Sequence, residues 1–196
     1  MRTVVTLVTG PVLLLVGVVL MLTPDQWTSS HLIFLAGTVA MLPVAVRLDT
    51  LLRDASPPWV RVPALVLTVV GALALAGQFV IDFTVLRLAH GEREAAGAMF
   101  DTLQESRVFA LVFYQAGPAL LFTGLALAAV GLVNRSWRWA GGLLVAGALL
   151  VGAARVTGLR AGEVVGLALV VAALVLTGRA AGGGAAGREV GGRANV

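Results

Sequence analysis

The stretch VPALVLTVVGALALAGQFVI, residues 62–81, contains no charged residue and decides the fold class. As an α-helix rising about 1.5 Å per residue, a run of this length crosses a hydrocarbon core about 30 Å thick. The whole chain of 196 residues has the same character, because 59% of it is apolar, 12% is charged and its mean hydropathy is +0.96. These values exclude a soluble globular domain and predict an all-α integral membrane protein.

Similar apolar runs along the chain predict a bundle of six transmembrane helices. Their approximate bounds are 4–22, 31–47, 62–88, 108–133, 138–159 and 161–178. The last two reach a spanning length only by continuing past Arg155 and Glu163, which places these charges at or inside the outer membrane boundary. Residues 92–107 predict an amphipathic helical connector along the outer surface. The Gly/Ala-rich tail 179–196 cannot bury a core, so it is predicted to be disordered in the cytoplasm.

The arginines predict the orientation in the membrane. With six helices, nine of the 14 basic residues fall on the side of the two termini and five on the other. The positive-inside rule therefore places both termini in the cytoplasm. The arginines form no basic face beside aromatic residues, so we expect the lipid bilayer, and not nucleic acid, as the partner.

The residue inventory excludes several chemistries. The chain has no cysteine, no lysine and only two histidines, His31 and His90. Thiol nucleophiles, thiolate metal sites and Schiff bases are thereby excluded, and motifs for zinc proteases, P-loops and dinucleotide binding are missing. We therefore predict no enzyme activity, no cofactor and no metal site.

Polar side chains gather toward the predicted outer ends of the helices. Gln78 and Asp82 are four residues apart and share one helix face. Tyr114 and Gln115 lie in the next predicted helix, just before Pro118, which cannot donate a backbone hydrogen bond to the Tyr114 carbonyl. Ionisable groups inside a membrane are costly and usually face the bundle interior. The candidate site therefore comprises Gln78, Asp82, Tyr114, Gln115, Arg155 and Glu163, with His31 nearby.

Two interpretations of this cluster stay open. In the first, Asp82 pairs with Arg107, Arg155 or Arg160 and the amides hold helices together, so that the chain is a non-catalytic membrane protein with a structural role. In the second, the cluster is an outward-facing pocket around Asp82 that takes a small ligand or a proton from the outer face. The chain would then be a small secondary transporter or a ligand sensor. Neither interpretation fixes the oligomeric state.

Glycines recur every seven residues in two predicted helices, at 10 and 17 and again at 117, 124 and 131. Such stripes allow helices to approach closely. The segments 10–17 and 117–124 also share the pattern GPxLLxxG, which raises the hypothesis of a three-plus-three inverted repeat.

One part of the chain resembles known sequences. Asp101, Leu103, Ser106 and Phe109 form the pattern DxLxxSxxF, which is followed by GPxLL from Gly117 and by WRWAG at 137–141. This run resembles multi-pass bacterial membrane proteins grouped as domains of unknown function. The resemblance implies a multi-pass protein of the bacterial cytoplasmic membrane. Trp137 and Trp139 also suit an interfacial anchor at the cytoplasmic surface.

Overall fold

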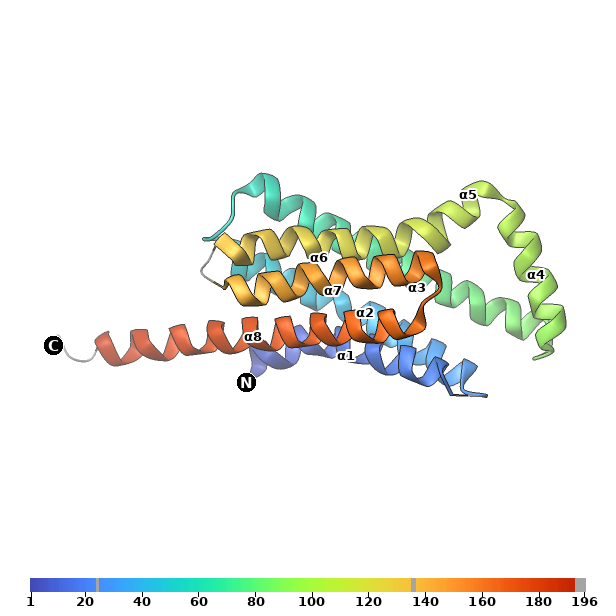
Figure 1. Ribbon diagram of the computed structural model, residues 1–196, viewed down its shortest axis with the longest axis horizontal. Helices are drawn as coiled ribbons and strands as arrows, with labels where there is room; N and C mark the ends of the chain where they lie inside the picture. Colours follow the sequence, from blue (N-terminus) through green and yellow to red (C-terminus); the bar gives the residue numbers. More distant parts are fainter. Residues whose placement is uncertain (24, 135–136, 193–196) are drawn as a thin grey trace.

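The computed structural model describes residues 1–192 except 24, 135 and 136, and every regular element within them is helical (Figure 1). The elements are α1 (Arg2–Met21), α2 (Trp27–Leu52), α3 (Pro58–Leu88), α4 (Arg93–Glu105), α5 (Arg107–Phe109), the π-helix η1 (Ala110–Ala116), α6 (Gly117–Asn134), α7 (Arg138–Thr157) and α8 (Arg160–Gly192).

Five helical segments among the described residues are long and apolar enough to cross a membrane. They are Arg2–Met21, Trp27–Leu52, Pro58–Leu88, Arg107–Val133 and Arg160–Gly182. The predicted helical, membrane-spanning character of the chain is confirmed to this extent. α7 packs between α6 and α8, beside these segments.

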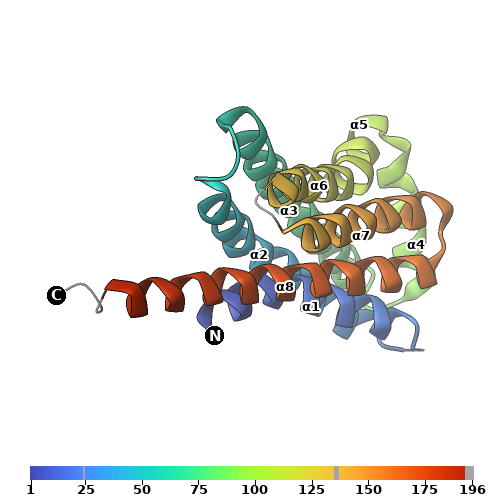
Figure 2. The ribbon, with the colours of Figure 1, turned by 60° about the vertical axis from the view of Figure 1, so that its left-hand side comes forward.

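The long helices close into a ring. Each packs against the next in the order α1, α2, α3, α6, α7, α8, and α8 packs against α1 (Figures 1 and 2). Both termini lie toward one end of this bundle, which we call the terminus end. The α1–α2 and α7–α8 connections and α4 lie at the other, which we call the connector end.

Glycines set the closest helix contacts, and the predicted seven-residue stripes contribute those of Gly10 and Gly124. An added Cβ at Gly10 would lie 2.8 Å from Met41 Sδ of α2, and one at Gly124 would lie 2.5 Å from the Thr68 nitrogen of α3. In α7, a Cβ at Gly147 would lie 2.7 Å from the carbonyl oxygen of Gly166 in α8. The ring is thus built from three closely packed helix pairs, α1/α2, α3/α6 and α7/α8.

The contacts of the two glycine motifs do not support the inverted-repeat hypothesis. A repeat that relates α1 to α6 also relates α2 to α7, so Gly10 and Gly117 would face equivalent neighbours. Gly10 instead faces α2, whereas Gly117 faces Ala74 and Leu75 of α3. The shared GPxLLxxG pattern therefore reflects two local helix contacts.

The outer surface of the ring is apolar, as contact with lipid requires. Exposed valines and leucines cover it on several helices, among them Val39, Val66 and Leu73. Trp139, at the start of α7, is 86% exposed, which suits the interfacial anchor that the sequence predicted. Trp137 differs from the prediction, because it is only partly exposed and packs against the core.

The structure describes the predicted connector and most of the predicted tail. The connector 92–107 contains α4, and its Ala96 is buried against Val85 and Ala89 at the end of α3. The tail differs from the predicted disorder, since α8 continues as a helix to Gly192. Once the apolar segment has supplied the helix nucleus, each further residue adds a hydrogen bond at low cost. Residues 193–196 of the predicted tail lie outside the described residues.

Candidate functional site

A cavity of about 730 Å³ lies between the α3/α6 pair and the α7/α8 pair, and we call it the large cavity. Small-molecule sites commonly measure about 300–1,000 Å³. Its walls are formed by Gln78, Tyr114, Gln115, Pro118, Ala119, Gly152, Arg155, Gly158, Arg160 and Glu163. Five of the six predicted site residues line it, and the sixth, Asp82, lies beside Tyr114.

The π-helix explains why the cavity forms at this place. Pro118 has no N–H to donate to the carbonyl of Tyr114, four residues before it. In a π-helix a carbonyl accepts a hydrogen bond from the N–H five residues later, so this geometry accommodates the missing donor. η1 packs against α3 and α4, whereas α6, which continues from it, packs against α7. The chain before Gly117 thus diverges from α7 toward α5 (Figures 1 and 2). The large cavity occupies the space where the two helices separate.

Asp82 is buried beside a tyrosine and a histidine. The Tyr114 hydroxyl donates a hydrogen bond to Asp82 Oδ1 at 2.9 Å, and His31 Nε2 lies 3.9 Å from Asp82 Oδ2. The predicted pairing of Asp82 with Arg107, Arg155 or Arg160 is therefore replaced by contacts with residues of η1 and α2. The physical reason is the ring order, which places α2 next to α3, whereas α7 and α8 lie across the bundle.

Aromatic rings hold His31 in place. Its ring stacks on Trp27 at a centroid distance of 3.9 Å and meets the edges of Phe79 and Phe83 at 5.8 and 6.4 Å. His31 Nδ1 lies 2.8 Å from the Trp27 carbonyl oxygen, so the Nδ1–H tautomer donates there and leaves Nε2 facing Asp82. His31, Asp82 and Tyr114 thus form a chain of polar groups that ends at the wall of the large cavity.

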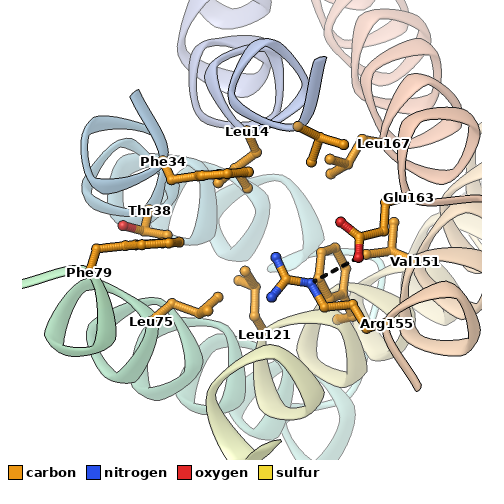
Figure 3. Close-up of a pocket in the computed structure, with 12 residues that line it drawn as sticks. Leu14, Phe34, Thr38, Leu75, Phe79, Leu121, Val151, Arg155, Glu163 and Leu167 are labelled. Carbon is orange, nitrogen blue, oxygen red and sulfur yellow. Dashed lines mark ion pairs between the residues drawn. The ribbon is translucent and has the colours of Figure 1, made fainter. Parts of the chain in front are cut away.

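Glu163 binds two arginines. Its carboxylate lies 3.8 Å from Arg155 Nε and 3.3 Å from Arg160 Nη1, and Glu163 is only 2% exposed. Figure 3 shows the Arg155 guanidinium and Glu163 at the edge of a small central cavity, with apolar side chains of the other helices opposite them. This central cavity measures about 20 Å³, room for about one water molecule, and each of the six long helices contributes to its walls. Arg155 and Glu163 line both cavities and therefore separate them.

Two buried polar atoms at the large cavity have no hydrogen-bond partner among the described residues. They are Gln78 Oε1, an acceptor, and Arg155 Nε, a donor. Buried polar groups in native proteins are almost always hydrogen-bonded, since leaving one unpaired costs about 1–3 kcal/mol. Gln78 and Arg155, which both line the large cavity, thus each keep one buried atom without a hydrogen bond, and Arg155 Nε lies 3.8 Å from the Glu163 carboxylate.

Arg160 and the contact of His31 with Asp82 were missing from the candidate site that we predicted. Arg160 precedes Glu163 by three residues at the start of a helix, a spacing that brings the two side chains together. Trp27 and His31, four residues apart, likewise share a helix face. That this face meets Asp82 depends on the ring order, which no local pattern encodes.

This arrangement can bind a ligand and can hold a proton. No group of three or more histidine, aspartate or glutamate side chains that could hold a metal ion occurs in the described part of the chain. The carboxylates lie beside a phenol, an imidazole and guanidinium groups. Comparison with family models, with curated proteins and with solved structures finds no match for this chain.

Proposed function

We propose that this chain is a non-catalytic, six-helix protein of the bacterial cytoplasmic membrane that binds a small ligand in the large cavity. Five spanning segments with α7 as the sixth return both termini to the same side. The excess of arginine on that side supports a cytoplasmic location for the termini, so that the connector end faces outward. The protein would act as a ligand sensor or as a small secondary transporter, and in the second case this structure is its outward-facing state.

One observation carries the proposal. The large cavity brings together polar side chains from distant parts of the chain, Gln78, Tyr114, Arg155 and Glu163. A cluster that served only to hold helices together would fill its own space and satisfy its own hydrogen bonds. This one surrounds about 730 Å³ and leaves Gln78 Oε1 and Arg155 Nε without hydrogen bonds.

A thiol-labelling experiment tests the proposal without background, because the chain has no cysteine. We would introduce Gln78→Cys, label intact cells with a membrane-impermeant maleimide, and compare two controls. Ser29→Cys is exposed at the connector end, and Thr68→Cys lies on the same helix as Gln78 at a position only 2% exposed.

Labelling at positions 78 and 29, but not at 68, is the expected result. Labelling at position 29 alone would mean that the cluster is sealed, and the structural interpretation would replace the proposed function. If neither position 78 nor position 29 were labelled in intact cells, but position 29 were labelled in inside-out vesicles, the orientation in the membrane would be inverted.

A further inference from the structure

The charges around the large cavity are unequal. Two arginines, Arg155 and Arg160, and a single glutamate, Glu163, line it. The Arg160 side chain is 46% exposed, so donors remain available beside its contact with Glu163. Guanidinium groups bind phosphate and carboxylate oxygens through paired hydrogen bonds. The electrostatics of the cavity therefore suit an anion.

The cavity is flanked by surface that suits a lipid tail. Gln115 and Ala119, on its η1/α6 wall, are exposed at the outside of the bundle. Near them Leu111 is 56% exposed, and Leu149 of α7, one helical turn before the cavity residue Gly152, is 64% exposed. In a membrane such apolar side chains face acyl chains. A molecule reaching the cavity between η1 and α7 would therefore lie partly in the hydrocarbon region.

The depth of the cavity matches a headgroup. Gly158 and Arg160 belong to the turn that ends α7 and begins α8, so the rim of the cavity lies where these helices meet the membrane boundary. Lipid phosphates lie at this level.

We infer that the large cavity binds the headgroup of an anionic phospholipid, which enters sideways between η1 and α7. The phosphate contacts Arg155 and Arg160, and the acyl chains lie along Leu111 and Leu149. This inference rests on the proposed function, because it assigns the ligand class of the same cavity.

The test uses the full chain in detergent, titrated with phosphatidylglycerol or with phosphatidylcholine and analysed by native mass spectrometry. We expect phosphatidylglycerol to bind at least about tenfold more tightly. Arg160→Gln should abolish this preference, since the loss of a charge-assisted hydrogen bond worth about 1.4 kcal/mol or more corresponds to tenfold or more in Kd. Arg87→Gln is the matched control, because Arg87 is exposed at the same end of the bundle and does not line the cavity.

A second variant keeps the charges and fills the entrance. Ala119→Phe, at an exposed position on the cavity wall, should weaken phosphatidylglycerol binding by a similar factor while the melting temperature without added lipid stays at the wild-type value. Equal affinity for the two lipids, or equal effects of Arg160→Gln and Arg87→Gln, would overturn the inference. Displacement of the lipid by the same concentration of glycerol phosphate would also overturn it and assign the cavity to a soluble phosphate.

The two proposals fail separately. Labelling of Gln78→Cys from outside together with no lipid preference would remove the ligand class and leave the proposed function. No labelling of Gln78→Cys would remove the proposed function, whatever lipid is bound elsewhere.

Discussion

Replacing Gly71 by alanine tests the closest helix contact in the ring. A Cβ at this position would lie 2.2 Å from the Leu121 nitrogen, 2.7 Å from Leu121 Cα and 2.8 Å from the carbonyl oxygen of Gly117. All three are backbone atoms of α6, so no rotation of a side chain can make room. α3 and α6 must move apart before an alanine fits.

The expected cost follows from this displacement. Reaching the 3.4 Å lower limit of ordinary contact requires a local separation of about 1 Å, and a gap of that size removes a quarter to a half of the dispersion energy of the facing atoms. Overpacking of this kind costs about 1–3 kcal/mol. The same movement would stretch the hydrogen bond between Tyr114 and Asp82, now 2.9 Å, because the two residues lie on the segments that separate.

The free energy of unfolding, measured by titration with sodium dodecyl sulfate in mixed micelles, checks this prediction. Gly142→Ala is the matched control, since no atom lies within 4 Å of a Cβ there. We expect it to be neutral or slightly stabilising, because alanine favours helix over glycine by up to about 1 kcal/mol. Equal stability of Gly71→Ala and Gly142→Ala would refute the close packing of α3 on α6.

Three further substitutions probe the site and its surroundings by the same unfolding measurement. Tyr114→Phe should cost about 0.6–1.7 kcal/mol, from the average to the largest value found for hydrogen bonds inside a membrane protein, and no cost at all would mean that this hydroxyl has no protein partner. Glu163→Ala removes a carboxylate whose side chain is 3% exposed and leaves two arginines unpaired, so it should cost about 3 kcal/mol, whereas Asp49→Ala removes a 14% exposed carboxylate, leaves one arginine and should cost about 1 kcal/mol; a reversed order would contradict the burial of Glu163. Gly158→Ala should cost about 1 kcal/mol because φ is +71° at this position, and Gly152→Ala, with open space around it, should be tolerated.

Hydropathy and spacing predicted much of the fold. The predicted helix 62–88 corresponds to α3, Pro58–Leu88, and the short apolar run 138–159 corresponds to α7, Arg138–Thr157. These agreements have one cause: an uncharged run in a bilayer must satisfy its backbone hydrogen bonds internally, so its length sets the helix. The same constraint turned the candidate residues toward the interior of the bundle, because polar groups in spanning helices face away from lipid.

The contacts within the site were beyond this reasoning. Antiparallel helices can be ordered around a bundle in several ways, and only the order fixes whether Asp82 meets an arginine of α7 or His31 of α2. The π-helix before Pro118 also escaped prediction, although the proline marked the place where regular bonding fails. Local sequence specifies which face of a helix is polar, whereas the neighbour of that face is set by packing over the whole chain.

The large cavity depends on the closed ring, because the ring order places α7 and α8 across the bundle from α3. A Cβ at Gly178 of α8 would lie 3.0 Å from Val4 Cα of α1, which is within reach of a disulfide. We would introduce Val4→Cys with Gly178→Cys, oxidise native membranes, and compare the pair Val5→Cys with Gly178→Cys, since Val5 is 59% exposed. The ring predicts a disulfide within one chain for the first pair only. No disulfide in the first pair, or equal yields in both, would contradict the closed ring and the cavity built on it.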